Sequence, residues 1–150
     1  MTKILALDCA TKTGYAIVVD GQLKESGVQD FSKKRGESNG ILFLRFRKWI
    51  DGLVDLTKPE VIAYERAHFR GGAATELCVG LQTRVQESAA FRNIPCLPIT
   101  SSSVKKFATG SGRASKQDML YQAAIFLNRP PIDDNKADAV LLAMFANSEV

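Results

Sequence analysis

Three acidic residues stand where an α/β protein can carry out chemistry. Asp8 ends a short apolar run, Glu65 ends a second one, and Asp138 lies early in an apolar helical segment. In open α/β sheets, sites form at the ends of strands and at the helix termini that face them. Carboxylates that converge there raise each other's pKa unless a cation neutralises them. Two divalent ions about 4 Å apart in such a cluster can activate water and stabilise a leaving oxygen in phosphodiester cleavage.

Each acid also has an ordinary structural interpretation. Asp8 could accept backbone hydrogen bonds in the turn that follows it, and Glu65 could form an ion pair with a base such as Arg66. Asp134 could cap the final helix, and Asp138 could be a solvated helix residue. An apolar strand that ends in an acid, twice in one small domain, is harder to explain in these terms and favours a metal site.

Other metal-binding residue types are scarce. The sequence has one histidine, His68, and its cysteines stand far apart without forming a CxxC pair: Cys9, Cys78 and Cys96. This pattern indicates neither a disulfide framework nor a zinc site. Any metal is therefore expected on carboxylate oxygens, and oxygen ligands favour magnesium or manganese.

Hydrophobic periodicity and turn signals divide the chain into strands and helices. We expect strands at residues 3–8, 14–20, 23–29, 60–65 and 94–99. We expect helices at residues 40–56, 74–92, 101–107, 115–127 and 134–146. Asp20 and Gly21 signal a hairpin, which makes the first three strands an antiparallel meander. The order predicts an α/β domain with a mixed sheet covered by helices, whose last two strands run parallel.

The two long helices carry apolar stripes at helical spacing. In the first helix the stripe consists of Leu42, Phe46, Trp49, Leu53 and Leu56. In the second helix it consists of Ala74, Leu77, Cys78, Leu81, Val85 and Ala89. We expect one face of each helix to cover the sheet. The small and apolar residues left on the second helix could also meet a partner chain.

The composition is typical of a globular protein. Hydrophobic residues make up 45% and charged residues 24% of 150 residues, which is the usual size of one domain. We therefore expect residues 1–150 to form a single domain. No apolar run reaches the length of a membrane span, and the N-terminus lacks signal-peptide features, so we expect a cytoplasmic protein without a membrane partner. The net charge of +4 is compatible with a polyanionic partner.

A basic segment late in the chain could bind phosphate. Its cations surround a Gly-Ser-Gly sequence that would let the backbone approach DNA closely: Lys105, Lys106, Arg113 and Lys116. Phosphate contacts supply a large share of the affinity of proteins for DNA. A solvated basic surface is the alternative interpretation. Lys12, in the first hairpin, could pair with the acids or with a phosphate.

Segments spread along the chain resemble, in order, the motifs of one nuclease family. Residues 4–16 contain Ile-Leu-Ala-Leu-Asp and then Thr-Lys-Thr-Gly-Tyr-Ala, and residues 61–65 read Val-Ile-Ala-Tyr-Glu. Residues 104–116 contain Val-Lys-Lys and then Gly-Ser-Gly-Arg-Ala-Ser-Lys. Residues 136–143 read Lys-Ala-Asp-Ala-Val-Leu-Leu-Ala. In this order and spacing the chain resembles the RuvC-type Holliday-junction resolvases.

The resemblance implies an RNase H-like fold, with a five-stranded mixed sheet flanked by helices, and a homodimer. It implies an endodeoxyribonuclease that cuts four-way and other branched DNA with Mg²⁺ or Mn²⁺, two ions to each active site. Carried over by position, Asp8, Glu65 and Asp138 are metal ligands. Lys105 and Lys116 lie near the scissile phosphate or its neighbours.

The family pattern also concerns an aromatic residue after Glu65 and a fourth ligand near Asp138. Phe69, in the loop after Glu65, matches an aromatic residue that contacts unpaired bases at the junction centre, although a core position is the alternative. Many members carry a fourth ligand three residues before the final aspartate, and this position holds Asn135. Asp134 stands four residues before Asp138, and positions i and i+4 share a helix face. We therefore expect Asp134 as a catalytic metal ligand in its place.

Other functions fit parts of the pattern. A nuclease of the same fold that processes ribosomal RNA precursors, the YqgF type, is one alternative, but the basic segment and Phe69 favour branched DNA. An actin-like ATPase or sugar kinase also opens with a strand, an aspartate and a Thr-Gly hairpin, but it needs two such domains. A catalytically inactive DNA-binding module is the third alternative, if Asp134 and Asp138 do not both face the metal ions.

Overall fold

The computed structural model describes residues 2–67, 71–127 and 134–150, apart from the side chains of Leu127, Asp134 and Asn135. The strands are β1 Lys3–Asp8, β2 Lys12–Val19, β3 Gln22–Asp30, β4 Val61–Glu65 and β5 Cys96–Ile99. The helices are α1 Asn39–Thr57, α2 Ala73–Phe91, α3 Ser101–Thr109, α4 Lys116–Leu127 and α5 Asp134–Glu149. The elements follow the predicted order, with ends that differ by up to three residues.

The strands form a five-stranded mixed sheet in the order β3-β2-β1-β4-β5. β2 runs antiparallel to both β1 and β3, which makes the predicted meander. β4 runs parallel to β1 and to β5, and the helical segment α2 connects β4 to β5 as parallel neighbours require. The prediction of a mixed sheet flanked by helices is confirmed.

The turn between β2 and β3 sets the register of the outer hairpin. Asp20 and Gly21 both have positive φ, 51° and 81°, the combination of a type I′ turn, whose twist matches that of the strands beside it. The Asp20 side chain accepts a hydrogen bond from the Thr2 N–H at 2.8 Å, which ties the turn to the start of β1. At its other end the same hairpin pairs Lys12 with Asp30.

β1 is covered on both faces, as its central place in the sheet requires. Leu5 and Leu7 belong to one hydrophobic cluster, while Ile4 and Ala6 belong to the other, and all are fully buried. The alternation follows from the two-residue period of a strand. The fully buried run stops at Asp8, which is only partly buried and ends the strand.

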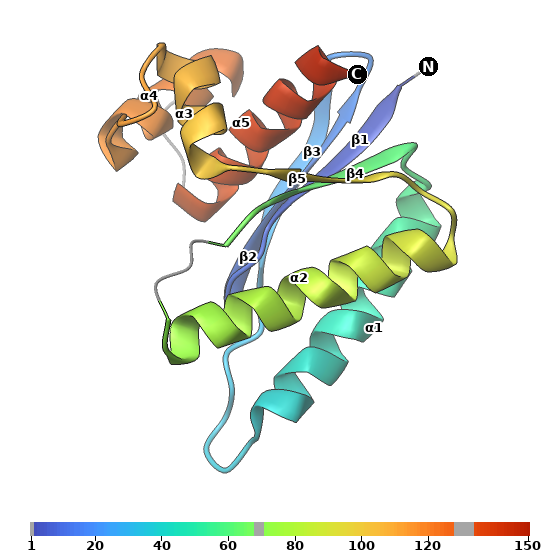
Figure 1. Ribbon diagram of the computed structural model, residues 1–150. Coiled ribbons are helices and arrows are strands. Elements are labelled where there is room, and N and C mark those ends of the chain that lie inside the picture. Colours follow the sequence, from blue (N-terminus) through green and yellow to red (C-terminus); the bar gives the residue numbers. More distant parts are fainter. Residues whose placement is uncertain (1, 68–70, 128–133) are drawn as a thin grey trace.

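The helices divide between the two faces of the sheet (Figure 1). α1 and α2 cover one face, where buried residues such as Phe46 and Leu81 pack against the strands. α3, α4 and α5 cover the other face, and the alanine-rich side of α5 lies directly on β1 and β2. No helix within the described ranges is long and apolar enough to cross a membrane.

The predicted apolar stripe of α1 is wrong at its last residue. The sequence predicts Leu56 on the covered side of the helix, but Leu56 is 82% exposed, and Ile50 and Val54 are buried there instead. Leu56 stands two positions after Val54, a rotation of about 200° at 3.6 residues per turn. Ala74, predicted on the covered side of α2, is likewise exposed in the first turn of that helix.

α2 is docked closely on α1. Gly80 of α2 faces the ring of Phe43, and a Cβ atom at position 80 would clash with that ring. Near the end of α2, the Arg92 guanidinium donates hydrogen bonds to Asp51 at 3.1 Å and to Asp55 at 2.7 Å, both on α1. These contacts fix α2 against α1, and α2 in turn is hydrogen-bonded to β4 through Gln82 and Gln86.

Candidate metal centre and nucleic-acid interface

Asp8 stands at the end of the central strand, and the turn after it is closed by one buried threonine. The Thr13 hydroxyl donates to the Ala10 carbonyl at 2.6 Å and accepts from the Ala10 N–H at 3.4 Å. Thr13 is fully buried, so water does not compete for these bonds. The register then pairs Asp8 with Gly14. The backbone that carries the Asp8 carboxylate therefore has little freedom.

Glu65 ends β4, the strand beside β1. Glu65 pairs with Ile99 of β5, and the Arg66 N–H donates to the Ile99 carbonyl at 2.7 Å. Because β1 and β4 are parallel neighbours, their carboxyl ends lie at the same edge of the sheet. Asp8 and Glu65 are therefore brought side by side from sequence positions far apart.

Asp138 comes from the N-terminal part of α5, on the other face of the sheet. Ala137 and Ala139 on either side of it are fully buried, and side chains this small let α5 lie close to β1 and β2. Asp138 itself is only partly buried. The close packing brings its carboxylate to the edge where β1 and β4 end.

The three acids form one cluster. Asp8, Glu65 and Asp138 each offer a carboxylate oxygen, and these oxygens lie within 4.8 Å of one another. Burial raises the pKa of the Glu65 carboxyl, and the charge of Asp138 raises it further. A hydrogen bond between Asp8 and Glu65 and the nearby charge of Lys105 act in the opposite direction. The cluster therefore concentrates negative charge that a divalent cation can neutralise.

The chemistry of the donors fits a hard cation. The thiols nearby are poor competitors, because burial and then the charge of Asp8 raise the pKa of both Cys9 and Cys78 and keep them protonated. Carboxylate oxygens remain as the charged ligands, and such ligands suit magnesium and manganese. The site can thus hold a metal ion of that class.

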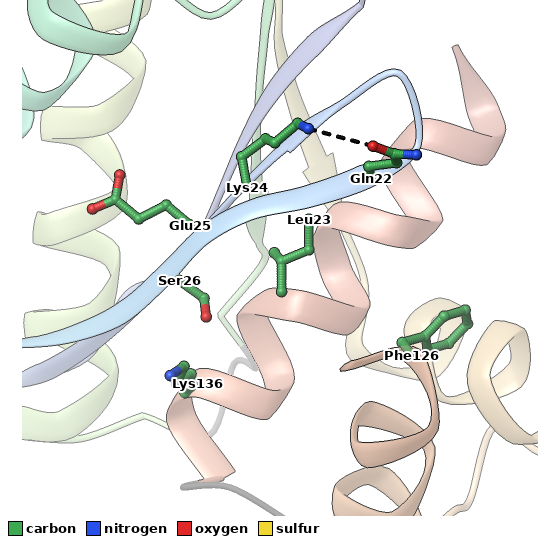
Figure 2. Close-up of a pocket in the computed structure, with 7 residues that line it drawn as sticks. All are labelled: Gln22, Leu23, Lys24, Glu25, Ser26, Phe126 and Lys136. Carbon is green, nitrogen blue, oxygen red and sulfur yellow. Dashed lines mark hydrogen bonds between the residues drawn. The ribbon is translucent and has the colours of Figure 1, made fainter. Parts of the chain in front are cut away.

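A hollow of about 260 Å³ opens beside the cluster, lined by Asp8 and Glu65 and by Thr75, Cys78 and Gln82 of α2. A larger hollow, about 590 Å³, lies between β3, the end of α4 and the start of α5. Figure 2 shows its side chains, with Lys24 hydrogen-bonded to Gln22. Its lining contains none of the three clustered acids. The smaller hollow is therefore the candidate active site.

The predicted cations lie at different distances from the cluster. Lys105 of α3 is half-buried and close enough to Glu65 for its charge to act on that carboxyl. Lys106 is exposed in the last turn of α3. Arg113 is exposed beside a separate hollow of about 370 Å³, and Lys116 is exposed as the first residue of α4. Of these cations, Lys105 is the one whose charge acts on the cluster, while Lys106, Arg113 and Lys116 are exposed on α3, on the loop after it and on α4.

Lys12 lies opposite Asp30, at the end of the β2–β3 hairpin, and is exposed. The pKa of Asp30 is lowered chiefly by hydrogen bonds from Ser32, with a smaller contribution from the charge of Lys12. The charge of Lys12 thus acts on Asp30, and a contact of Lys12 with the clustered acids or with a phosphate stays a prediction.

Two predicted site residues lie outside the described part of the chain. Phe69 is among the residues that the structure does not describe, and the side chain of Asp134 is likewise not described. The backbone of Asp134 begins α5, one helical turn before Asp138. Their roles therefore stay predictions.

Two residues that are not among those predicted from the sequence support the cluster. Thr13 closes the turn after Asp8, and Gln82 contacts the end of β4. Gln82 stands on the apolar side of α2, between Leu81 and Val85, and is 6% exposed. A polar residue within an apolar helical stripe was the available signal, since buried polar groups need a partner.

Comparisons with known proteins agree with this geometry. The model of the family crossover junction endodeoxyribonuclease RuvC matches residues 4–145. The crossover junction endodeoxyribonuclease RuvC of Desulforamulus reducens is 33% identical over 150 aligned residues, which cover 94% of this chain and 90% of that protein.

Solved structures share the fold. RuvC of Thermus thermophilus, in complex with a Holliday junction substrate, has a TM-score of 0.83 at 19% identity, covering 97% of this chain and 92% of that chain. The yeast mitochondrial Holliday junction resolvase has a TM-score of 0.69 at 17% identity, covering 97% of this chain and 78% of that chain. These likenesses confirm the predicted RNase H-like arrangement. Since the family match spans nearly all of the sequence, the chain belongs to the RuvC family of crossover junction endodeoxyribonucleases.

Proposed function

We propose that this chain cuts four-way DNA junctions, and other branched DNA, by metal-dependent hydrolysis of phosphodiester bonds. The observation that carries the proposal is the cluster of Asp8, Glu65 and Asp138, whose oxygens lie within 4.8 Å of one another at the end of the sheet. The family match supports the substrate, because its members are named for cleaving crossover junctions. The same match argues against the RNA-processing and ATPase alternatives.

The three carboxylates would hold Mg²⁺ or Mn²⁺, two ions in each active site. When bound, such ions polarise the scissile phosphate and favour deprotonation of a water. The protein's own contribution is to fix the carboxylates through the ends of β1 and β4 and through α5. Lys105, close to Glu65, adds a positive charge where a phosphate would enter. Asp134 is proposed as a fourth ligand on the same face of α5 as Asp138.

The basic surface is proposed to hold the DNA backbone. Lys105 and Lys116 would contact the scissile phosphate or its neighbours, Lys106 and Arg113 would contact flanking phosphates, and Lys12 would reach a phosphate of one arm. Phosphate contacts of this kind position DNA without reading its sequence. Phe69 would stack on an unpaired base at the junction centre, which only an opened junction offers.

The proposal includes a homodimer, since two nicks across a four-way junction require two active sites. The apolar and small residues of α2 that do not face the sheet are its proposed contact. We further propose that residues 1–150 act as one nuclease domain. The proposed place of action is the cytoplasm.

A cleavage assay tests the proposal directly. Purified protein is incubated with a labelled four-way junction, with a duplex of matching sequence and with a single-stranded RNA, each with Mg²⁺, with Mn²⁺ or with excess EDTA. We expect paired nicks in the junction only, and only with metal. Cleavage that persists in EDTA would contradict the metal centre, while preferred cleavage of the RNA would favour the RNA-processing alternative.

A further inference from the structure

A buried glutamine of α2 contacts the strand end that carries Glu65. The Gln82 Nε2 donates a hydrogen bond to the Glu65 backbone carbonyl at 3.1 Å. Gln82 is only 6% exposed, and an amide buried without a partner costs free energy. This bond therefore links α2, on one face of the sheet, to the residue that enters the acidic cluster.

The bond from Gln82 lies at the end of β4, where the strand has fewer backbone partners. The residue pairs between β1 and β4 end at Leu7 and Tyr64, so Glu65 lies beyond the last pair with β1. On the other side β5 holds the chain through Ile99. Gln82 supplies a donor to the Glu65 carbonyl from the helix, at a point beyond the last backbone pair with β1.

The same side chain lies beside the cluster itself. Gln82 lines the hollow that Asp8 and Glu65 border. We infer that Gln82 is a positioning residue of the metal centre: it fixes the end of β4 so that the Glu65 carboxylate stays within reach of the carboxylates of Asp8 and Asp138. The inference rests on the proposed metal site, but it does not depend on which nucleic acid is cut.

The helix provides a matched control one turn further along. The Gln86 Nε2 donates to the Tyr64 hydroxyl at 2.9 Å, so it is also a glutamine of α2 bonded to β4. Its partner is a phenol, and Gln86 is not among the residues that line the hollow at the cluster. Loss of this second bond should disturb the packing of α2 on β4 without releasing the end of the strand.

The test compares Gln82→Met with Gln86→Met, since methionine keeps the length of glutamine and removes the amide. Binding of Mn²⁺ alone is followed by the electron paramagnetic resonance signal of the free ion, and kcat and KM are measured for a four-way junction. Partners that orient metal ligands change affinity or activity by roughly tenfold to a hundredfold. We expect Gln82→Met to weaken Mn²⁺ binding and lower kcat by about tenfold, with KM for the junction unchanged. Gln86→Met should stay close to wild type in all these values.

Wild-type Mn²⁺ affinity and kcat in Gln82→Met would overturn the inference, and so would equal losses in both variants. If Gln82→Met does not fold by circular dichroism, Gln82→Asn replaces it, because its amide is one methylene too short to reach the Glu65 carbonyl. The same loss is then expected, and wild-type values overturn the inference again. If the wild-type protein binds Mn²⁺ and cuts no junction, the proposed function fails, while the Mn²⁺ titration still tests Gln82.

Discussion

At the scale of residues, we expect substitutions of single atoms in the carboxylate cluster to have the largest effect on junction cleavage. Asp8→Asn or Glu65→Gln replaces a charged oxygen by an amide nitrogen while keeping the side-chain shape. We expect junction cleavage to fall by at least about a hundredfold, which corresponds to about 2.7 kcal/mol of transition-state stabilisation. Junction binding should be unchanged or tighter, since a negative charge facing phosphate is removed. A gel shift and a cleavage time course measure the two effects.

The same pair of measurements distinguishes a structural role. If binding is lost in a variant that is folded by circular dichroism, the acid supports the DNA-binding surface rather than the metal. Junction binding and cleavage by the acid variants are compared with those of Thr13→Val. This variant removes the hydroxyl that closes the turn after Asp8 and leaves every carboxylate in place.

The fourth ligand is a second question at this scale. Asp134 and Asp138 are separated by one turn of α5, whereas Asn135 occupies the family position and brings no charge. We expect Asp134→Asn to lower the cleavage rate by at least tenfold, about 1.4 kcal/mol, and Asn135→Ala to be milder. Asn135→Asp should restore part of the activity in the Asp134→Asn background. Wild-type cleavage by Asp134→Asn, together with an inactive Asn135→Ala, would assign the ligand to position 135.

The residues of the cluster could be identified from sequence, but their supports could not. Asp8 and Glu65 each end an apolar run, and parallel neighbouring strands must end at the same edge, so their meeting follows from the strand assignment. Gln82 acts through a backbone carbonyl of a distant strand. That contact depends on how closely α2 docks on the sheet, which no local pattern encodes.

At the scale of elements, α3 and the start of α4 carry the basic surface. The charge of Lys105 acts on Glu65, and Lys116 begins α4. Each phosphate contact contributes about 0.9 to the slope of log affinity against log salt concentration for duplex DNA. We expect Lys105→Ala and Lys116→Ala each to weaken junction binding and to flatten this slope by close to one unit. Affinities measured between low and moderate salt check this, and unchanged slopes and rates for both variants would mean that neither lysine contacts DNA.

An ion pair between Glu37, just before α1, and Arg45 of α1 should stabilise the fold in a way that depends on pH. The Glu37 carboxylate accepts hydrogen bonds from the Arg45 guanidinium and from the Lys34 N–H at 2.6 Å, and these lower the pKa of Glu37 to about 2 from 4.5. A lowered pKa in the folded state stabilises the protein above pH 4.5, and this contribution is lost as the pH falls towards 2. We expect Glu37→Gln to lower the unfolding temperature at pH 7, with a difference from wild type that shrinks below pH 4.5.

The control for this effect is Glu60→Gln. Glu60 is exposed and takes no part in the ion pairs of the described residues. A difference from wild type that is the same for both variants at every pH would mean that the Glu37 pair adds nothing specific. Thermal unfolding followed by circular dichroism between pH 2 and 7 provides the comparison.

Most elements could be predicted because each carries a strong local signal. The Asp20-Gly21 turn and the alternation in β1 are examples. The buried faces of the helices carry a weaker local signal. Leu56 continues the apolar pattern of α1, yet only packing against the sheet decides which stripe is buried, and Ile50 and Val54 occupy that place.

At the scale of the whole molecule, the metal centre works against the stability of the fold that builds it. The edge of the sheet and a helix on one of its faces contribute to one cluster of carboxylates: Asp8 and Glu65 come from strand ends and Asp138 from α5. Like charges this close destabilise the folded state, where they are held together, more than the unfolded chain, where they separate. A bound cation reverses the balance, because it binds the folded state and not the unfolded one.

The stability of Asp138→Asn should therefore change in opposite directions with and without metal. Without added metal, the variant loses one of the repelling charges and should unfold at a higher temperature than wild type. With Mg²⁺ or Mn²⁺ at about 100 times its dissociation constant, wild type gains about 2.7 kcal/mol, roughly 5–10 °C in unfolding temperature for a chain of this size. The variant should gain little, so the order of the two proteins reverses. Calorimetry in EDTA and in metal measures this, and a variant that is less stable in EDTA yet gains as much from metal as wild type would show that Asp138 is not a ligand.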